Sequence, residues 1–214
     1  RKLIMSVSGL FLVLFLLFHM SMNLAAVFST EAYNAICEFL GANWYALAGT
    51  LILAAGVVVH LVYATVLTLH NRSSRGSQRY AMTAEPEGVT WASRNMYVLG
   101  IIIVLGLLLH LYNFWYNMQF AEIIGNHELG PFPPADGAAY IAALFSSPVY
   151  CIIYLVWFAA IWFHLTHGFW SAFHTIGWDN QTWLPRLKRI ANVVATIVFL
   201  CFALVVIVFY LRSL

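Results

Sequence analysis

Long apolar runs separated by short polar segments form the dominant pattern of the sequence. The hydrocarbon core of a bilayer is about 30 Å thick, and a helix needs roughly 20 apolar residues to cross it. The runs that meet this length predict membrane-spanning helices at residues 3–28, 43–70, 94–120, 146–173 and 187–211. Because these spans leave too little chain for a second domain, residues 1–214 are predicted to form one all-α integral membrane domain.

The composition agrees with this fold class. With 63% hydrophobic and 8% charged residues, the chain has too little polar surface to coat a water-soluble globule. We therefore expect membrane lipid around it and no nucleic-acid partner. The first run follows Arg1 and Lys2, as a signal peptide would, but it is long and lacks a small-residue cleavage pattern. We interpret it as a retained helix.

Charged residues are distributed unequally between the two sides of the predicted five-helix zigzag. One side carries the basic residues Arg1, Lys2, Arg72, Arg75, Arg79, Arg94, Arg186, Lys188 and Arg189. The other side carries Arg212 and the acidic residues Glu31, Glu38, Glu122, Glu128 and Asp136. Because short cytoplasmic segments carry an excess of Lys and Arg, we expect a cytoplasmic N-terminus and an outer C-terminus.

Two of the connecting segments carry further signals. The stretch EAYNAICEFLGANW, which begins at Glu31, has apolar residues at helical spacing and predicts a short interfacial helix before the second span. The segment that runs to about residue 145 contains GPFPPADG, whose prolines break regular structure. The fifth span carries no histidine, so we expect it to serve packing and lipid contact.

Each of the first four spans carries one histidine deep in its apolar run: His19, His60, His110 and His164. Each lies 16 or 17 residues from the entry end of its span, which corresponds to about 24 Å of helix. Since successive spans alternate in direction, His19 and His110 should meet in the outer half of the membrane. His60 and His164 should meet in the inner half, about 15 Å away.

Paired imidazoles at two depths predict two bis-histidine haem sites, because an unpaired ionisable group inside a membrane is costly. Gly56, Gly106 and Gly168 each lie four residues from one of these histidines and would leave bare backbone for a macrocycle. The alternative is that the glycines allow close helix packing and the histidines hydrogen-bond across it. The cysteines Cys37, Cys151 and Cys201 form no CxxC or CxxCH motif, so any haem is b-type.

The remaining histidines are weaker candidates. His167 lies three residues after His164 and could replace it as a ligand. His70 and His174 fall near the inner interface, where solvent or a haem propionate could satisfy them. His127 lies in an outer segment, where we expect it to be solvated.

These motifs together give the chain a family resemblance. They are GLFLVLFLLFH ending at His19, the following EAYNA, HLVYATVLTLHNR starting at His60, LLLHLY around His110, and FHLTHGFWSAF around His164. In this order and spacing, the sequence resembles the five-helix diheme cytochrome b subunit of succinate dehydrogenases and fumarate reductases that use menaquinone. The similarity covers nearly the whole chain.

The resemblance implies a function in a respiratory complex of the bacterial cytoplasmic membrane. His60 and His164 would hold the haem nearer the cytoplasm, and His19 and His110 the outer haem. The subunit would anchor a flavoprotein carrying FAD and an iron–sulfur protein, and would pass electrons between them and menaquinone. Succinate and fumarate would react on the partner. The basic segments 71–94 and 179–189 would form the docking surface, and a dimer of the whole complex is left open.

Two other classes of protein fit parts of the pattern. A diheme cytochrome b that anchors a hydrogenase or a formate dehydrogenase would also show paired histidines, but its partner would dock on the outer side. A haem-free transporter or assembly protein would use the histidines for metal binding or packing.

Quinone chemistry adds a candidate for proton exchange. Because quinol oxidation releases two protons, we expect a carboxylate near the outer haem and near water. Glu38 is the leading candidate, Glu31 and Glu122 are the alternates, and simple solvation of all three is the competing interpretation. No Asp or Glu lies in the interior of a predicted span, and Trp162 stands two residues before His164. We therefore expect electron transfer to move charge across the membrane without a compensating proton.

Overall fold

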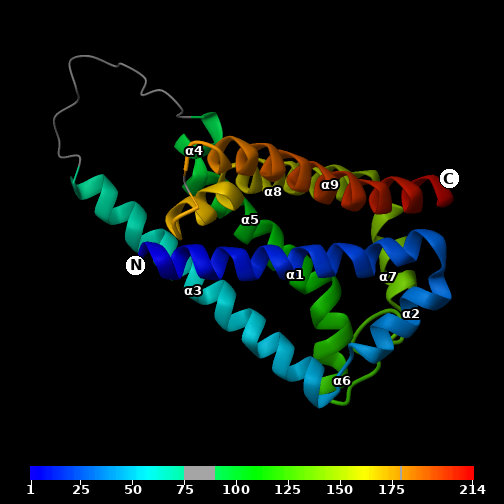
Figure 1. Cartoon of the computed structure of the whole chain (residues 1–214). Coiled ribbons are helices and arrows are strands. Elements are labelled where there is room, and N and C mark those ends of the chain that lie inside the picture. Colours follow the sequence, from blue (N-terminus) through cyan, green and yellow to red (C-terminus); the bar gives the residue numbers. More distant parts are fainter. Residues whose placement is uncertain (75–89, 179) are drawn as a thin grey trace.

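The computed structural model describes residues 1–74, 90–178 and 180–214, and these residues form helices and connecting segments without a β-strand (Figure 1). In chain order the elements are α1 (Lys2–Phe28), α2 (Thr30–Phe39), α3 (Trp44–Ser74), α4 (Trp91–Arg94), α5 (Met96–His110), the π-helix η1 (Leu111–Phe120), α6 (Ala121–Ile123), α7 (Gly137–Phe145), α8 (Pro148–Thr175) and α9 (Trp183–Arg212).

Five helices are long and apolar enough to cross a membrane, which confirms the five predicted spans. They cover Lys2–Phe28, Trp44–Ser73, Met96–Ile123, Pro148–Thr175 and Trp183–Arg212. The third of these runs continuously through α5, η1 and α6. The observed ends lie within a few residues of the predicted ones, and the chain is therefore a multi-pass membrane protein by the length and composition of its helices.

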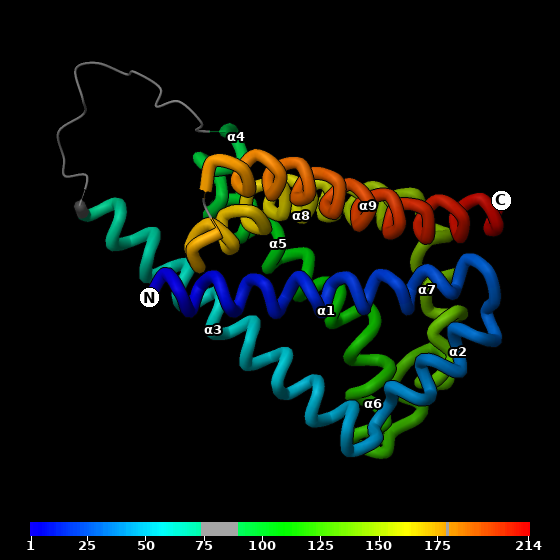
Figure 2. Tube along the Cα trace, viewed as in Figure 1, coloured from blue at the N-terminus to red at the C-terminus, as the bar shows by residue number. Residues whose placement is uncertain are grey.

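The helices pack around an antiparallel pair formed by α8 and α9. This pair makes the most extensive interface, and α1 packs against both of its members and against α3. The helix α5 packs on α8, whereas α3 packs mainly on α1 (Figure 2). No part of the α3 span is buried within the chain. The helix α3 therefore forms one edge of the bundle. Among the described residues, its extended interface is with α1.

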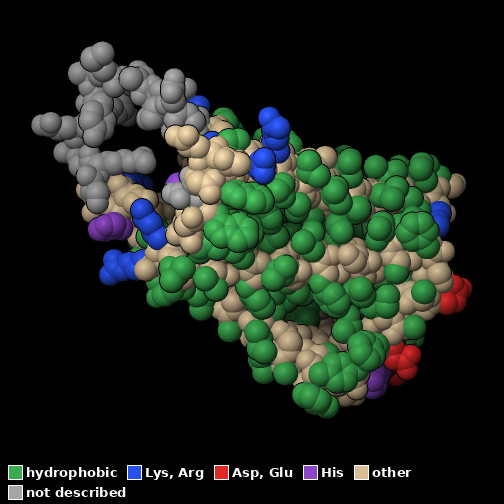
Figure 3. All heavy atoms as spheres, in the orientation of Figure 1, with side chains coloured by type: hydrophobic (Ala, Val, Ile, Leu, Met, Phe, Trp, Pro, Cys, Tyr) green, Lys and Arg blue, Asp and Glu red, His purple; other side chains and the backbone are tan. Residues whose placement is uncertain are grey.

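Small residues permit the close helix approach at the centre of the bundle. Ala26 of α1 and Ala191 and Ala195 of α9 have no exposed surface, as is usual where membrane helices approach closely. Phe158 of α8 stacks on Phe202 of α9 with ring centroids 5.2 Å apart. Large apolar side chains also cover the outside of the bundle (Figure 3), where lipid can solvate them.

The charges separate along the bundle as the sequence predicts. Lys and Arg side chains gather at the end where α1 begins, and Asp and Glu side chains gather at the opposite end (Figure 3). Arg212 is the exception; its guanidinium donates a hydrogen bond to the carbonyl of Val27 at 2.9 Å, so α9 and α1 end side by side. Residues 75–89, with Arg75 and Arg79 of the expected docking surface, lie outside the described residues, as does residue 179.

Two short helices, α2 and α7, complete the acidic end. The predicted helix before the second span is confirmed as α2, whose N-cap Ser29 accepts a hydrogen bond from the amide of Ala32 at 3.1 Å. The helix α7 is not predicted by the sequence, because the prolines before it suggested irregular structure through to about residue 145. Asp136 caps α7 and also accepts a hydrogen bond from Asn34 of α2 at 2.8 Å. These bonds fasten α7 to α2.

Candidate functional site

The structure brings the four intramembrane histidines together as two pairs. His19 of α1 and His110 of α5 have ring centroids 5.7 Å apart and ring planes inclined at 86°. His60 of α3 and His164 of α8 have centroids 6.3 Å apart and planes inclined at 64°. We call these the outer pair and the inner pair, after the membrane halves in which the sequence predicts them. The partners are those expected from their depth in each span.

The spacing within each pair matches two ligands of one metal ion. A metal–imidazole bond is about 2 Å long and a ring nitrogen lies about 1 Å from its centroid, so trans imidazoles have centroids about 6 Å apart. The separations of 5.7 and 6.3 Å lie on either side of this value. An ordinary edge-to-face contact between two aromatic rings has the same range of separations, so the spacing is compatible with a shared metal and does not by itself assign one.

The outer pair lies in an aromatic environment. His110 contacts Phe114 at 5.1 Å, Trp157 at 5.7 Å and Tyr154 at 6.4 Å between ring centroids. His19 stacks on Phe15 at 5.4 Å. Uncharged aromatic rings therefore surround much of the outer pair.

Polar side chains of α1 reach one imidazole of each pair. Asn23 lies one turn after His19, and its Nδ2 is 3.3 Å from Nε2 of that ring. Ser8 Oγ lies 3.3 Å from Nδ1 of His60, on the neighbouring α3. Each pair therefore has one ring that is oriented by a hydrogen-bonding group of α1.

The other ring of each pair has a nitrogen without a partner. Nδ1 of His110 and Nδ1 of His164 are buried and make no hydrogen bond, and Nδ1 of His167 is in the same state. A buried polar group without a partner costs about 1–3 kcal/mol. Unsatisfied nitrogens in both pairs fit a site that is completed by a group from outside the chain.

Each pair offers two imidazoles as its donor set for a metal. Within residues 1–74, 90–178 and 180–214, no group of three or more His, Cys, Asp and Glu side chains could hold a metal ion. Structural zinc needs four protein ligands and catalytic zinc usually three. Two axial imidazoles suffice when a macrocycle supplies the remaining four nitrogens, as in haem.

Two glycines lie beside the inner pair, Gly168 as the sequence spacing predicts and Gly9 without a prediction. A Cβ added to Gly9 of α1 would lie 3.3 Å from Cε1 of His60, so α1 and α3 approach closely at this histidine. Gly168, on the helix of His164, would place a Cβ 3.9 Å from Cδ2 of that ring. Gly9 was missed as a site residue because it precedes no histidine by four residues; its contact with His60 is made between helices.

Gly56 and Gly106 face aromatic side chains of neighbouring helices. Gly56 leaves room for the ring of Phe11, and Gly106 leaves room for the indole of Trp157. The Trp157 Nε1 donates to the carbonyl of Ile103 at 3.0 Å, which fixes the indole beside His110. The sequence left two interpretations of these glycines, bare backbone for a macrocycle or close helix packing. At Gly56 and Gly106 the structure shows close helix packing.

The secondary histidines stand apart from the pairs. His167 packs on Trp170 with centroids 5.0 Å apart, while the ring contact of His60 is with His164. His174 lies further along the same helix, 6.3 Å from Trp170. His127 is exposed at the acidic end. The geometry thus separates His164 from its sequence neighbour His167.

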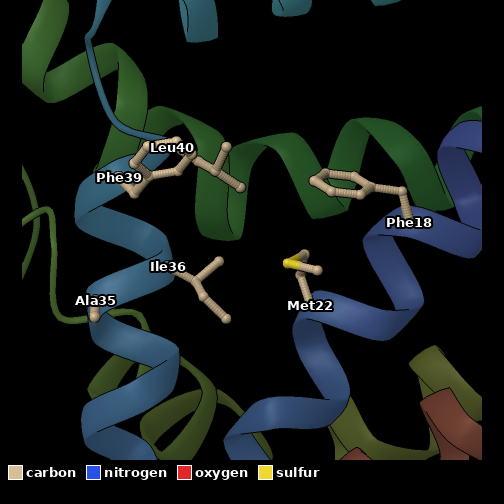
Figure 4. Close-up of a pocket in the computed structure, with 6 residues that line it drawn as sticks. All are labelled: Phe18, Met22, Ala35, Ile36, Phe39 and Leu40. Atoms are coloured by element: carbon tan, nitrogen blue, oxygen red, sulfur yellow. The ribbon is translucent and has the colours of Figure 1, made fainter.

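The helix α2 separates two hollows near the outer pair. On one side is an apolar groove of about 280 Å³, lined by Phe18 and Met22 of α1 and by Ala35, Ile36, Phe39 and Leu40 at the α2 end. Ile36 and Met22 point toward each other across it (Figure 4). The second hollow, of about 370 Å³, is polar and is lined by Glu31, Asn34, Ala35, Glu38, Pro133, Ala135 and Asp136.

The three candidate carboxylates differ in their surroundings. Glu31 and Glu38 are exposed and line the polar hollow. Hydrogen bonds from the backbone amide of Glu31 itself and from the Ser29 hydroxyl stabilise the Glu31 carboxylate and lower its pKa below the usual range. Glu122 is half-buried, and its carboxylate accepts a hydrogen bond from the amide of Ala42 at 2.7 Å. Glu122 is therefore fixed beside the turn that ends the apolar groove.

Comparison of the chain with protein-family models, with curated proteins and with solved structures finds no match.

Proposed function

We propose that the chain is a diheme cytochrome b that anchors a succinate dehydrogenase or fumarate reductase and exchanges electrons with menaquinone. The observation that carries the proposal is the presence of two histidine pairs, with centroids 5.7 and 6.3 Å apart, contributed by four spans. The resemblance of the sequence to this family extends the proposal from haem binding to the complex and its quinone.

In this function His19 and His110 would hold one b-type haem, and His60 and His164 would hold the other. A haem so bound supplies a one-electron redox centre. The chain holds each ring by packing: His110 lies against Trp157 and Phe114, and His60 lies against Gly9. A haem held by two histidines would have no open position for another ligand and would supply electron transfer alone.

The basic end of the bundle is the proposed docking surface for the iron–sulfur and flavoprotein partners in the cytoplasm. In the described residues it includes Arg72, Arg94, Arg186, Lys188 and Arg189. At this end Trp178, between α8 and α9, and Trp183, the first residue of α9, are exposed, and Arg186 lies over the Trp183 ring. By the positive-inside rule this end faces the cytoplasm of a bacterial cell.

Menaquinone is proposed to react near the outer pair. The apolar groove between α1 and α2 begins at Phe18, the residue before His19, and its lining suits an isoprenoid chain. Glu38 lies on the opposite side of α2, facing the polar hollow, whereas Glu122 holds the turn at the end of the groove. Both carboxylates are candidates for proton exchange with the quinone.

The deciding experiment is a haem count on the purified protein. We expect two haems per chain and a reduced-minus-oxidised spectrum of low-spin b-type haem. Alanine at His19, His60, His110 or His164 should reduce the count to about one, whereas His127→Ala is the matched control at an exposed position. A haem-free wild type would exclude the proposal.

Two further results refine the assignment. His167→Ala should retain both haems, because His60 contacts the ring of His164; loss of the inner haem in this variant alone would transfer the ligand role to His167. Reduction of the haems by succinate in the assembled complex supports the proposed partner. Reduction by hydrogen or formate would instead assign the chain to another respiratory dehydrogenase.

A further inference from the structure

The ring of His110 is surrounded by aromatic side chains, and no hydrogen bond restrains its buried nitrogen. This Nδ1 has no partner among the described residues. A histidine that binds a metal usually donates its second ring N–H to an acceptor of the protein, which fixes the orientation of the ring. At His110 the orientation of the ring therefore depends on the side chains that pack against it.

Two of these side chains come from one face of α8. Tyr154 and Trp157 are three residues apart on this helix, so they point to the same side of it. Their ring centroids lie 6.4 and 5.7 Å from that of His110, and 5.7 Å from each other. Tyr154 is 2% exposed and Trp157 is half-buried. The three rings therefore form one packed cluster between α8 and α5.

Each of the two side chains is also hydrogen-bonded to the span that carries His110. Trp157 Nε1 donates to the carbonyl of Ile103, seven residues before His110, at 3.0 Å. Asn113, three residues after His110, donates through Nδ2 to the hydroxyl of Tyr154 at 3.0 Å. The two bonds lie on either side of His110 along the chain, so neither aromatic ring can slide along the span without losing a bond.

Gly106 makes room for the indole of Trp157. A Cβ at this position would clash with the Nε1, Cδ1 and Cγ atoms of the indole. Gly106 lies about one helical turn before His110. The indole therefore rests on bare α5 backbone beside the histidine, and its hydrogen bond to Ile103 keeps it there.

We propose that Tyr154 and Trp157 are positioning residues that set the plane of the His110 ring for the outer haem. This inference rests on the proposed function. We call the two side chains, with their hydrogen bonds to α5 and η1, the α8 clamp. A ring whose Nδ1 lacks a partner among the described residues thereby takes its orientation from two side chains that are hydrogen-bonded. The planes of His19 and His110 are inclined at 86°, and the α8 clamp maintains this angle.

The α8 clamp acts on the outer pair alone. The ring contact of His164 is with His60, and His164 follows Trp157 by seven residues, about 10 Å along α8. The rings that contact Tyr154 or Trp157 are those of His110, Phe114, Phe145 and Phe158. A change in the clamp should therefore alter the outer haem and leave the inner haem as it is.

The test removes one bond of the clamp at a time and keeps an aromatic ring in place. Tyr154→Phe removes the hydroxyl that Asn113 binds, and Trp157→Phe removes the indole nitrogen that binds Ile103. The low-spin electron paramagnetic resonance signal of a bis-histidine haem depends on the angle between its imidazole planes. We expect both variants to retain two haems and to shift the outer signal, which is the one that His19→Ala abolishes. The inner signal should not change.

Gly106→Ala tests the seat of the indole. The added methyl group displaces Trp157, so the outer signal should shift. The outer haem should also transfer to excess apomyoglobin about 10-fold faster, the lower end of the effect of groups that orient a ligand. In a Trp157→Phe background the same substitution should have little further effect, because its action passes through the indole.

Two matched controls separate positioning from general packing. Trp162→Phe removes another indole nitrogen of α8, which donates to the hydroxyl of Thr196 of α9 at 3.0 Å. Tyr140→Phe removes another buried tyrosine hydroxyl, which donates to the carbonyl of Phe132 at 2.6 Å. Among the described residues, the ring contacts of Trp162 and Tyr140 are with Phe163 and Phe132, not with a histidine. Both variants should keep the wild-type outer signal.

Outcomes against the proposal are distinct. An unchanged outer signal in both Tyr154→Phe and Trp157→Phe would overturn the role of the α8 clamp and leave the proposed function intact. Equal shifts of both haem signals in these variants, or a shift of the outer signal in Trp162→Phe, would show a general loosening of α8 and would also overturn it. If Gly106→Ala does not fold, the two phenylalanine variants decide. A wild type without haem would remove both proposals together.

Discussion

Gly9 offers a way to disturb the inner pair from a neighbouring helix. A methyl group added at Gly9 of α1 would lie 3.3 Å from Cε1 and 3.7 Å from Nδ1 of His60. The shorter distance is tighter than ordinary van der Waals contact, so the ring of His60 must move by a few tenths of an ångström. Gly9→Ala should shift the ligand slightly, and Gly9→Val, which adds two more methyl groups, should displace it.

The expected change in stability follows from two opposing effects. Alanine favours a helix interior over glycine by about 1 kcal/mol. The displaced ring weakens the 3.3 Å contact between Ser8 and Nδ1 of His60, and the loss of a hydrogen bond costs about 1 kcal/mol. The free energy of unfolding of Gly9→Ala should therefore change little. Overpacking in Gly9→Val costs about 1–3 kcal/mol, which exceeds any gain in helix propensity.

If the chain binds two haems as proposed, redox titration and electron paramagnetic resonance follow each of them separately. Gly9→Val should lose or shift the signal that His60→Ala abolishes and leave the outer signal unchanged. Gly49→Ala and Gly100→Ala are the controls, because an added Cβ at either position meets no atom within 4 Å. If Gly9→Val retained an unaltered inner signal, the close approach of α1 to His60 would not constrain the ligand, and the reasoning would be wrong.

Three further predictions concern the outer end and the membrane potential. Glu122→Gln should reduce quinol-linked turnover with both haems retained, since the Glu122 carboxylate is half-buried and accepts a hydrogen bond from the Ala42 amide. Glu38→Gln should also reduce turnover if Glu38 exchanges the protons. Full turnover in either variant removes that carboxylate from the mechanism. Burial raises the pKa of the Cys37 thiol from 9.0 to about 11, which lowers the thiolate fraction at pH 8 about 100-fold. Iodoacetamide should therefore label Cys37 far more slowly in the folded protein than after denaturation. Equal labelling rates would contradict the burial of the thiol. Turnover between menaquinone and succinate or fumarate in sealed liposomes should change a potential-sensitive dye signal, because two electrons crossing 100 mV involve about 4.6 kcal/mol; sustained turnover without a signal would refute charge movement.

The spans and the pairing of histidines were predictable because both depend on regular quantities. A bilayer fixes the length of an apolar run, and a helix rises by a constant 1.5 Å per residue. Counting residues from each span entry therefore placed His19 at the level of His110, and His60 at the level of His164. The observed ring contacts have the same partners.

The unpredicted elements depend on contacts that hydropathy does not encode. The helix α7 starts at a local signal, the Asp136 cap, but the prolines before it dominated the interpretation of the segment. The π-helix η1 follows His110 directly, and in it Asn117 donates to the carbonyl of Tyr112, five residues earlier, at 3.0 Å. Asn113 of the same segment bonds to Tyr154 of α8 at 3.0 Å. The bond to Tyr154 requires α8 to be in place.

The glycines show the same limit within the candidate site. Spacing along one helix identifies Gly168, which faces the ring of His164 on its own helix. It cannot identify Gly9, whose neighbour His60 is on another helix, or show that Gly106 accommodates Trp157. Sequence periodicity describes a single helix, whereas a site between helices is completed by residues from the facing one.

The inner pair has a consequence for the attachment of α3. This helix packs mainly on α1, and its membrane span contributes no buried residue to the core. His60 nevertheless faces His164 of α8, a helix with which α3 has no extensive interface. In the proposed function, an iron between these rings would link α3 directly to the central α8–α9 pair. The inner haem would then stabilise the least packed helix of the bundle as well as carry electrons, and its loss would loosen α3 before α1, α8 or α9.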